Sequence, residues 1–350
     1  MHYTIKYLFL ALLLFNGNLN AQELWRDKSK DVFVMGQSIF DFAYRVHDRK
    51  EMDALIAEFD IKEGYSQLVS RKIINHILHT LTPLNQDVGG SASNTAVGLS
   101  KLGAIVTLMS VVGDDELGSL SIKKIINYGI YSLITRSSVD KTGIAAVIIS
   151  EKNDSDGNTS INRTMLIYPG VSAHQEYYNV DNEAIIDHKV IFSEGYLWGS
   201  ASTKIKELFS IAKKNNSLTA FTFGDKYVVS AHRKEFLEFI KNIDIVFTDD
   251  DQLFELYQEK DLESITPKLQ ANNNITVITM ADKGAYVVTP NERKHIPISE
   301  AKDIIDVTGA GDQFAAGFLY GYINDKSIEE CGKLASLKAA EIIQKIGPKP

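Results

Sequence analysis

The chain has 350 residues, which suggests about two domains, or one large α/β domain with an appendage. Apolar residues make up 44% and charged residues 23%, a balance typical of a soluble globular protein and unlike that of a disordered chain. Acidic residues outnumber basic ones by 45 to 37, so the net charge of −8 argues against binding to duplex nucleic acid, and the single cysteine, Cys331, excludes an intramolecular disulfide and a cysteine-based zinc site.

The first 21 residues have the pattern of a secretory signal peptide. Lys6 precedes an apolar run over residues 8–15, and Ala21 is a small residue at a candidate cleavage point. This run is too short to span a bilayer, which takes ~20 residues. The alternative is an extension upstream of the true start codon, or a disordered tail.

From Asp31 onward the apolar pattern predicts strands that alternate with helices. Strands are predicted at 32–35, 105–112, 190–192, 219–223, 243–247, 275–279 and 285–288, and helices at 48–59, 71–81, 93–102, 119–128, 203–213, 231–240 and 252–258. Strands rich in Val, Ile and Phe between helices indicate the α/β class, with a mostly parallel central sheet covered by helices on both faces. Segments 42–46, 61–69, 142–149 and 164–168 alternate apolar and polar residues more strongly and predict a smaller, partly exposed sheet.

The most specific motif is Thr308-Gly309-Ala310-Gly311-Asp312, which runs directly into a helix of small and aromatic residues. The two glycines permit a tight turn in which several N–H groups point at one anion, and the helix adds its positive N-terminal end. A carboxylate beside a phosphate site is repulsive unless it has a task, so Asp312 is a candidate general base that accepts a proton from an attacking hydroxyl. The alternative is an Asp that serves only as a helix cap.

Two further motifs predict contacts with an acceptor substrate. Gly89-Gly90-Ser91 opens a helix in which Asn94 offers both donors and acceptors to hydroxyls, although such a glycine pair is more often a packing turn. Asp41 follows the first strand, at the sheet edge where open α/β sheets bind ligands, and its carboxylate can bind two sugar hydroxyls. The alternative for Asp41 is a turn-forming residue.

Other candidates carry weaker signals. Glu194 ends a predicted strand, in a place where it can touch a substrate, and Arg163 precedes a strand and is either a phosphate clamp or a surface residue. The loop from Thr279 to Gly284 follows another strand and can lie over a nucleotide. The eight histidines show no metal-ligand spacing, and the chain has no Walker A motif.

Together, the Gly-Gly motif and the Thr-Gly-Ala-Gly-Asp motif resemble those of the ribokinase (PfkB-type) family of sugar and nucleoside kinases. The resemblance implies a ribokinase-like kinase domain over residues 31–350, with a small β-sheet lid built from segments near 42–88 and 142–168, and with ATP and Mg²⁺ as cofactors. The Asn162-Arg163-Thr164-Met165 motif and the Glu194–Trp198 run are most similar to adenosine kinases and their bacterial sugar-kinase relatives.

The resemblance also implies roles for individual residues. Asp312 is the expected catalytic base, and Gly309, Ala310 and Gly311 form the expected anion hole. Asp41, Gly90, Asn94 and Glu194 match substrate-binding positions, and Arg163 matches a lid arginine that approaches the phosphates. The nucleotide-binding positions are Thr308 and the loop residues Thr279, Ala281 and Gly284.

The chain departs from the family pattern in three places: the Asn-x-x-Glu motif, the nucleotide loop, and Gln37, which occupies a position often held by Asn. The Asn-x-x-Glu motif tied to Mg²⁺ is replaced by Asp249 and Gln252, which moves the charge from the last position to the first. Ala281 stands where the nucleotide loop has its first Gly, a mild change if the φ angle there is negative. Ser91 stands where ribokinases carry Lys, which weakens a ribose assignment.

These features predict an enzyme that moves the γ-phosphoryl group of ATP onto a primary hydroxyl of an adenosine-like nucleoside or a sugar. The alternatives are a ribokinase- or fructokinase-type sugar kinase, a non-catalytic nucleoside- or sugar-binding protein of the same fold, and a secreted sugar-binding protein. Because ATP is scarce outside the cytoplasm, a kinase site favours a cytoplasmic location over export. The expected partner is a small molecule, with no nucleic acid and no membrane, and the lid sheet is a candidate homodimer surface.

Overall fold

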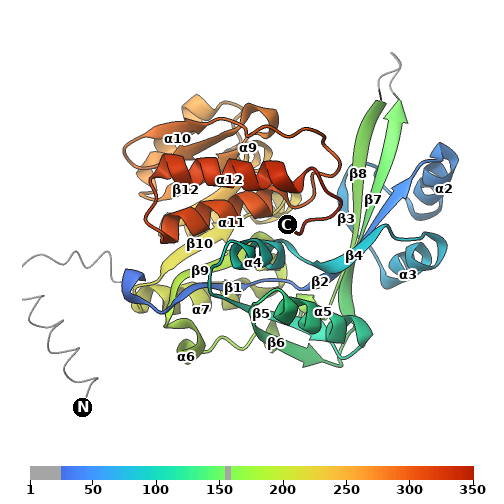
Figure 1. Ribbon diagram of the computed structural model, residues 1–350, viewed down its shortest axis with the longest axis horizontal. Helices are drawn as coiled ribbons and strands as arrows, with labels where there is room; N and C mark the ends of the chain where they lie inside the picture. The colour runs from blue at the N-terminus through green and yellow to red at the C-terminus, as the bar shows by residue number, and fades with distance from the viewer. Residues whose placement is uncertain (1–24, 154–158) are drawn as a thin grey trace, which may run out of the picture.

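The computed structural model describes residues 25–153 and 159–350 and arranges them around two β-sheets (Figure 1). The predicted signal sequence at residues 1–21 lies outside the described residues. Within the two described ranges, no helix is both long enough and apolar enough to cross a membrane.

The large sheet contains β1 (Lys30–Met35), β5 (Val106–Gly113), β6 (Tyr131–Ser137), β9 (His188–Glu194), β10 (Leu218–Thr222), β11 (Ile245–Asp249), β12 (Ile275–Thr279), β13 (Ala285–Val288) and β14 (Arg293–Ile296). Their order is β14-β13-β12-β11-β10-β9-β1-β5-β6. The strands from β12 to β6 are parallel, and β13 and β14 are antiparallel at one edge. The predicted mostly parallel sheet is therefore confirmed.

Strand β1 shows why this sheet is buried on both sides. Val32 and Val34 face one apolar cluster, whereas Phe33 and Met35 face another, because successive side chains of a strand point to opposite faces. All four residues are fully buried. A strand with two buried faces reads as a continuous apolar run, which is what Val-Phe-Val-Met shows.

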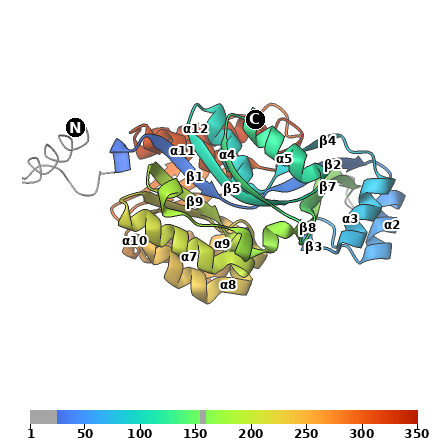
Figure 2. The same cartoon turned by 90° about the horizontal axis from the view of Figure 1, so that it is seen from below.

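Helices cover both faces of the large sheet (Figure 2). One face carries α4 (Ser91–Lys101), α5 (Glu116–Asn127), α11 (Ala310–Ile323) and α12 (Ile328–Ile342). The other carries α7 (Trp198–Lys214), α8 (Lys226–Phe239), α9 (Asp250–Tyr257) and α10 (Leu262–Ala271), and the short α6 (Asn182–Ile185) precedes β9. The chain thus forms a three-layer α/β domain.

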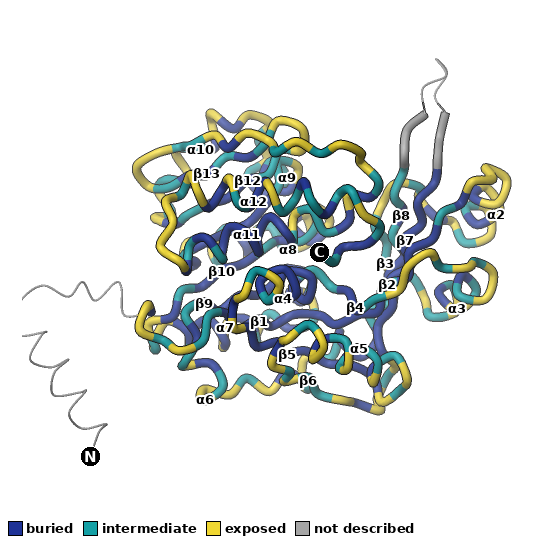
Figure 3. Tube along the Cα trace, viewed as in Figure 1, coloured by how far each residue is buried: buried dark blue, intermediate teal, exposed yellow. Residues whose placement is uncertain are grey.

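The second sheet, here called the lid, contains β2 (Ile39–Val46), β3 (Ser66–Leu68), β4 (Asn85–Gly89), β7 (Thr142–Asn153) and β8 (Thr159–Gly170), in the order β3-β8-β7-β2-β4. Helices α2 (Arg49–Phe59) and α3 (Arg71–Thr80) cover its outer face, where Met52 and Ile77 pack against Ile148 and Leu166. Figure 3 shows the exposed residues on the outer sides of these helices and buried strands beneath them.

The opposite face of the lid carries Ile39, Ala145 and Ile167 and turns toward the large sheet. Helices α2 and α3 cover one face of the lid, and the other face lines the cavity described below. A homodimer through the lid stays a prediction.

Candidate active site

A cavity of about 550 Å³ lies between the lid and the ends of the large-sheet strands. Its walls come from the lid strands β2 and β8, from the first turns of α4 and α11, and from the segments that follow β9, β10 and β11. In open α/β sheets, ligands bind at the carboxyl ends of the strands, as here. Of the predicted site residues, the cavity brings together Asp41, Gly90, Asn94, Arg163, Asp249, Gln252, Thr279, Thr308, Gly309, Ala310, Gly311 and Asp312.

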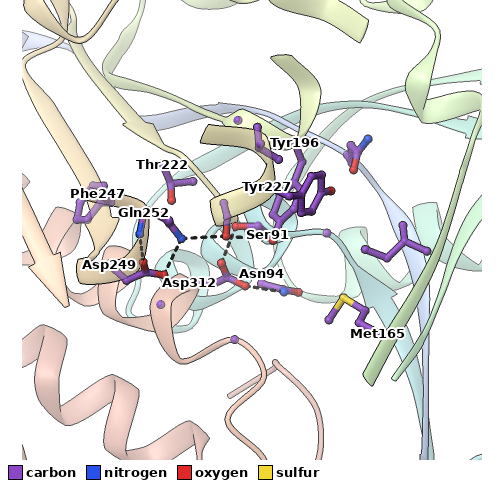
Figure 4. A pocket seen from close by; sticks show the side chains of 18 of the residues that line it. Ser91, Asn94, Met165, Tyr196, Thr222, Tyr227, Phe247, Asp249, Gln252 and Asp312 are labelled. Atoms are coloured by element: carbon purple, nitrogen blue, oxygen red, sulfur yellow. Dashed lines mark hydrogen bonds between the residues drawn. The ribbon is translucent and has the colours of Figure 1, made fainter. Parts of the chain in front are cut away.

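Asp312 lies in the first turn of α11 and is held by two side chains of α4. Its Oδ1 accepts a hydrogen bond from Ser91 Oγ at 2.6 Å, and its Oδ2 accepts one from Asn94 Nδ2 at 2.7 Å (Figure 4). Burial raises the pKa of the Asp312 carboxyl, and the two hydrogen bonds oppose that rise. An oriented carboxylate of raised basicity is suited to accept a proton.

The turn before Asp312 leaves backbone donors facing the cavity. Gly309 caps α11 with a φ of 81°, a conformation that favours glycine. The N–H of Ala310 donates to Val307 O at 3.2 Å, whereas those of Gly311 and Asp312 have no partner among the described residues. The N–H groups without a partner therefore belong to Gly311 and Asp312. The anion hole formed by Gly309, Ala310 and Gly311 stays a prediction.

Asp41 projects from β2 into the same cavity. Gly89 of β4, which pairs with Ile39, leaves room for the Asp41 side chain, because a Cβ on Gly89 would lie 2.0 Å from the Asp41 carboxyl carbon. Burial, together with the charges of Asp312 and Asp87, raises the pKa of Asp41 to about 7. Among the described residues this carboxylate accepts no hydrogen bond, so it is available to a ligand.

Gly90 and Arg163 line the same cavity as Asp41. Gly90 caps α4 with a φ of 96°, and a Cβ there would lie 2.2 Å from Gln37 O, so the turn has no room for a side chain. Arg163 of β8 donates to Thr308 Oγ1 at 3.3 Å, and Thr308 donates in turn to Asp306. The arginine therefore links the lid to the turn that precedes Asp312.

Glu194 has a different position from the one expected. Its side chain is fully buried and does not line the cavity. Its two carboxylate oxygens accept the N–H groups of Gln37 and Ala92, each at 2.6 Å. Burial raises the pKa of Glu194 to about 7. The residue therefore ties the turn after β1 to the start of α4, and its contact with a substrate stays a prediction.

Asp249 and Gln252, the predicted metal residues, lie together at the start of α9. Asp249 Oδ1 accepts the N–H of Gln252, and its Oδ2 accepts Gln252 Nε2, both at 2.7 Å. Burial raises the pKa of Asp249 to about 6, with the charges of Asp250, Asp251 and Asp225 adding to the rise. In the described ranges, no group of three or more His, Cys, Asp or Glu residues can hold a metal ion on its own.

The predicted nucleotide loop only partly reaches the cavity. Thr279 lines it, whereas Ala281 and Gly284 do not. Ala281 has a φ of 47°, so the condition for a mild replacement of glycine is not met. A left-handed conformation costs an alanine roughly 1–2 kcal/mol, and this exposed turn holds it there.

Sequence reasoning missed several residues of the cavity wall. Tyr196 follows β9, Tyr227 and His232 belong to α8, and Met165 comes from the lid. Tyr196 and Tyr227 each come shortly after a predicted strand, and this position could have identified them as candidates for the cavity wall. Lys349, whose Nζ donates to Asn94 Oδ1, had no such signal, because only the folded chain brings residue 349 near residue 94.

A helix N-terminus that faces the cavity, a carboxylate beside it and a lid over a three-layer α/β domain are features suited to a small-molecule phosphotransferase. The model of the pfkB family of carbohydrate kinases matches residues 54–350. The chain belongs to this family.

Relatives in this family are named for nucleosides and for sugars. The structure is similar to that of an adenosine kinase from Sinorhizobium meliloti, with a TM-score of 0.82 and 30% identity over 92% of this chain and 96% of the other. A probable sugar kinase from Rhizobium etli gives 0.82 and 29%, with the same two coverages. A nucleoside kinase from Methanocaldococcus jannaschii is 27% identical over 74% of this chain and 80% of its own length. The chain is thus a kinase of the sugar and nucleoside kinase family.

Proposed function

We propose that the chain transfers the γ-phosphoryl group of ATP to a primary hydroxyl of a nucleoside, with Asp312 as the general base. The observation that carries this proposal is the position of Asp312, which lines one cavity together with the free N–H group of Gly311 and the free carboxylate of Asp41. Donor, acceptor and base then meet in one cavity.

In the proposed reaction, Asp41 binds hydroxyls of the acceptor and fixes its orientation. The acceptor oxygen attacks the γ-phosphorus while its proton passes to the Asp312 carboxylate, and the bond from phosphorus to the ADP oxygen breaks. The N–H groups of Gly311 and Asp312 and the guanidinium of Arg163 stabilise the charge on the transferred group. Catalysis then consists of positioning and charge stabilisation.

The oxygen ligands that Asp249 and Gln252 offer at the start of α9 fit a magnesium ion that is held mainly by the nucleotide. Mg²⁺ is usually bound through one or two carboxylates together with phosphates and water. Asp249 lines the cavity and offers one carboxylate, with Gln252 keeping it in place. When bound, the ion neutralises phosphate charge.

The cavity wall favours a nucleoside over a simple sugar. The rings of Tyr196 and Tyr227 lie 6.4 Å apart, and Leu68, Met165 and Ile167 add an apolar surface from the lid. A purine base is a larger flat apolar surface than a free sugar, so it gains more from stacking and burial against this wall. A sugar kinase is the second candidate, because the Rhizobium etli neighbour bears that name.

We also propose a cytoplasmic location, because the donor substrate is ATP. The partner in this proposal is the small-molecule acceptor.

The test is a panel of acceptors with ATP and Mg²⁺ on the full chain. We expect acceptor-dependent ADP formation with adenosine or a related nucleoside, and a phosphorylated product by mass spectrometry. ADP formation with ribose or fructose alone would select the sugar-kinase alternative. Acceptor binding with no turnover would select the non-catalytic alternative and overturn the proposed function.

A further inference from the structure

The last residues of the chain lie close to α4 and α11, on the side of the large domain that faces the lid (Figure 1). Gly347 N donates to Asp306 Oδ2 at 2.9 Å, and Gln313 Nε2 of α11 donates to Pro348 O at 3.0 Å. From the lid, Asn85 Nδ2 of β4 donates to Ile346 O at 3.1 Å. Residues 346–349, here called the C-terminal strap, are therefore held by both the large domain and the lid.

The strap also packs against the turn that precedes Asp312. A Cβ on Gly309 would lie 2.6 Å from Pro348 Cβ, so the strap touches the backbone of that turn. These contacts fix the position of Pro348 and therefore limit where the side chain of Lys349 can reach. The Lys349 ammonium donates to Asn94 Oδ1, and the same amide donates through Nδ2 to Asp312.

An asparagine amide has one acceptor side and one donor side. With the oxygen engaged by an ammonium group, which has donors only, the NH₂ group is turned toward Asp312. Resting on the proposed function, we propose that Lys349 is a positioning residue for phosphoryl transfer: it orients the Asn94 amide toward the general base and supplies the cation that faces Asp41 and Asp312.

The charged groups around the strap explain why a cation is needed. Asp41 and Asp87 stand directly opposite each other on β2 and β4, where like charges are destabilising. Lys124 of α5 lies 3.2 Å from Asp87, which also accepts a hydrogen bond from Tyr128 at 2.5 Å. Asp87 therefore has its own cation, Lys124, and does not depend on the strap for one.

Asp41 and Asp312 have two cations near them, Arg163 from the lid and Lys349 from the strap. Both positive charges lower the pKa of the two carboxyls against the effect of burial. Burial lowers the pKa of Lys349 itself to about 8, while Asp41, Asp87 and Asp312 oppose that fall and Lys124 adds to it. Lys349 is then cationic at neutral pH, where the base must be ionised.

The experiment compares Lys349→Met, which keeps the length of the side chain without its charge, with Lys349→Arg, which keeps the charge. Lys345→Met is the matched control, because Lys345 is an exposed lysine close to the same terminus. For each protein, the carboxyl titrations of Asp41 and Asp312 are followed by carbon-13 NMR, with Asp41→Asn and Asp312→Asn used for assignment. The pH dependence of kcat, the affinity for ATP and the melting temperature are measured on the same samples.

We expect Lys349→Met to raise the pKa of both carboxyls and to lower kcat by about tenfold at pH 6.5 but much less at pH 8.5, the direction set by loss of a nearby opposite charge. ATP affinity should not change, Lys349→Arg should restore the wild-type pH profile, and Lys345→Met should match the wild type throughout. Unchanged carboxyl titrations in Lys349→Met would overturn the proposal. So would a fall in melting temperature and kcat with no change in the pH profile, since that result describes a structural strap.

The NMR titration separates this inference from the proposed function. If neither the wild type nor any variant turns over ATP, but the carboxyl titrations move as expected, the proposed function fails and the role of Lys349 toward the two carboxylates stands. If the wild type is active but the carboxyl titrations do not move, the proposed function stands and the role of Lys349 fails.

Discussion

Three of the carboxylates in or beneath the cavity, those of Glu194, Asp312 and Asp41, differ in their hydrogen-bond partners, and this difference assigns them different tasks. Glu194 has both oxygens engaged by backbone N–H groups, so it holds two segments together. Asp312 is oriented by Ser91 and Asn94 and keeps lone pairs for a proton. Asp41 has no hydrogen-bond partner among the described residues and is left to the ligand. Burial raises the pKa of all three, so burial alone does not distinguish their roles.

The raised pKa of Asp41 predicts an acidic limit to activity. A carboxyl with a pKa of about 7 is ionised only above that pH, and a ligand hydroxyl is best bound by the ionised form. We therefore expect kcat/KM for the acceptor to fall as the pH drops below about 7. Initial rates measured between pH 5 and pH 9 test this, and a profile that stays flat down to pH 5 would contradict it.

Substitution of Asp41 by Asn separates the two ligands. A hydrogen bond to a charged group contributes about 1.5–3 kcal/mol, so the acceptor KM should rise by roughly 10- to 100-fold. Affinity for ATP should stay within about twofold, because the proposed nucleotide contacts lie on other elements. An unchanged acceptor KM together with weakened ATP binding would mean that the two ligands are reversed.

At the scale of single elements, the start of α11 combines two glycines with different reasons to be glycine. Gly309 has a left-handed φ and lies against Pro348. Gly311 has no atom within 4 Å of the position a Cβ would occupy, and it is exposed to the cavity. The first glycine is required by the fold, and the second leaves space for the ligand.

Alanine at each position tests this distinction. Gly309→Ala should lower stability by about 1–3 kcal/mol, because an alanine is strained at that φ and its methyl group overlaps Pro348. Gly311→Ala should leave the melting temperature nearly unchanged but lower kcat/KM for ATP by roughly 10²-fold through displacement of the phosphate. Thermal unfolding and steady-state kinetics on the two variants decide. Equal losses of stability would contradict the assignment.

The Asp249–Gln252 pair at the start of α9 predicts an order of activity at low Mg²⁺ among three variants. In Asp249→Asn combined with Gln252→Glu, the two hydrogen bonds persist with the donor and acceptor of the side-chain pair exchanged. Gln252→Glu alone places two carboxylates together, and Asp249→Asn alone removes the charge. The double variant should therefore keep or improve activity at low Mg²⁺, and each single variant should do worse.

Activity measured against Mg²⁺ concentration for the wild type and these three variants tests the ordering. Four superimposable curves would show that the pair has no part in metal binding.

Elements with a clear apolar period were predictable, and elements with a mixed pattern were not. The buried strand β1 and the amphipathic helices α2 and α3 follow their periods closely. Strand β4 is mostly polar, Asn-Gln-Asp-Val-Gly, because it lies at an edge of the lid. Helix α10 contains Pro267, which removes a helical hydrogen bond and hides the helix from a pattern search.

At the scale of the whole molecule, the site joins segments that are far apart in sequence. Motifs around Asp41, Gly90 and Asp312 were recognisable because each pairs a turn with a chemically active side chain. The C-terminal strap was not, since Lys349 acquires its partners only when the chain end returns to α4. The free N–H of Gly311 and the engaged N–H of Ala310 also required the folded turn.

The two-part architecture gives the lid a defined role in the proposed reaction. The lid supplies Asp41 and Arg163, whereas the large domain supplies Asp312 and the helix N-terminus. In the proposed reaction, the residues that bind the acceptor and the general base therefore come from different parts of the molecule. Water is then excluded from the transferred group, which limits hydrolysis of ATP.

Replacement of Asp312 by Asn tests the assignment of the general base most directly. The amide keeps the shape of the side chain but cannot accept the proton, so kcat for acceptor phosphorylation should fall by roughly 10²–10⁴-fold while ATP affinity and melting temperature stay close to the wild type. Turnover of the Asn variant within about threefold of the wild type would contradict the account.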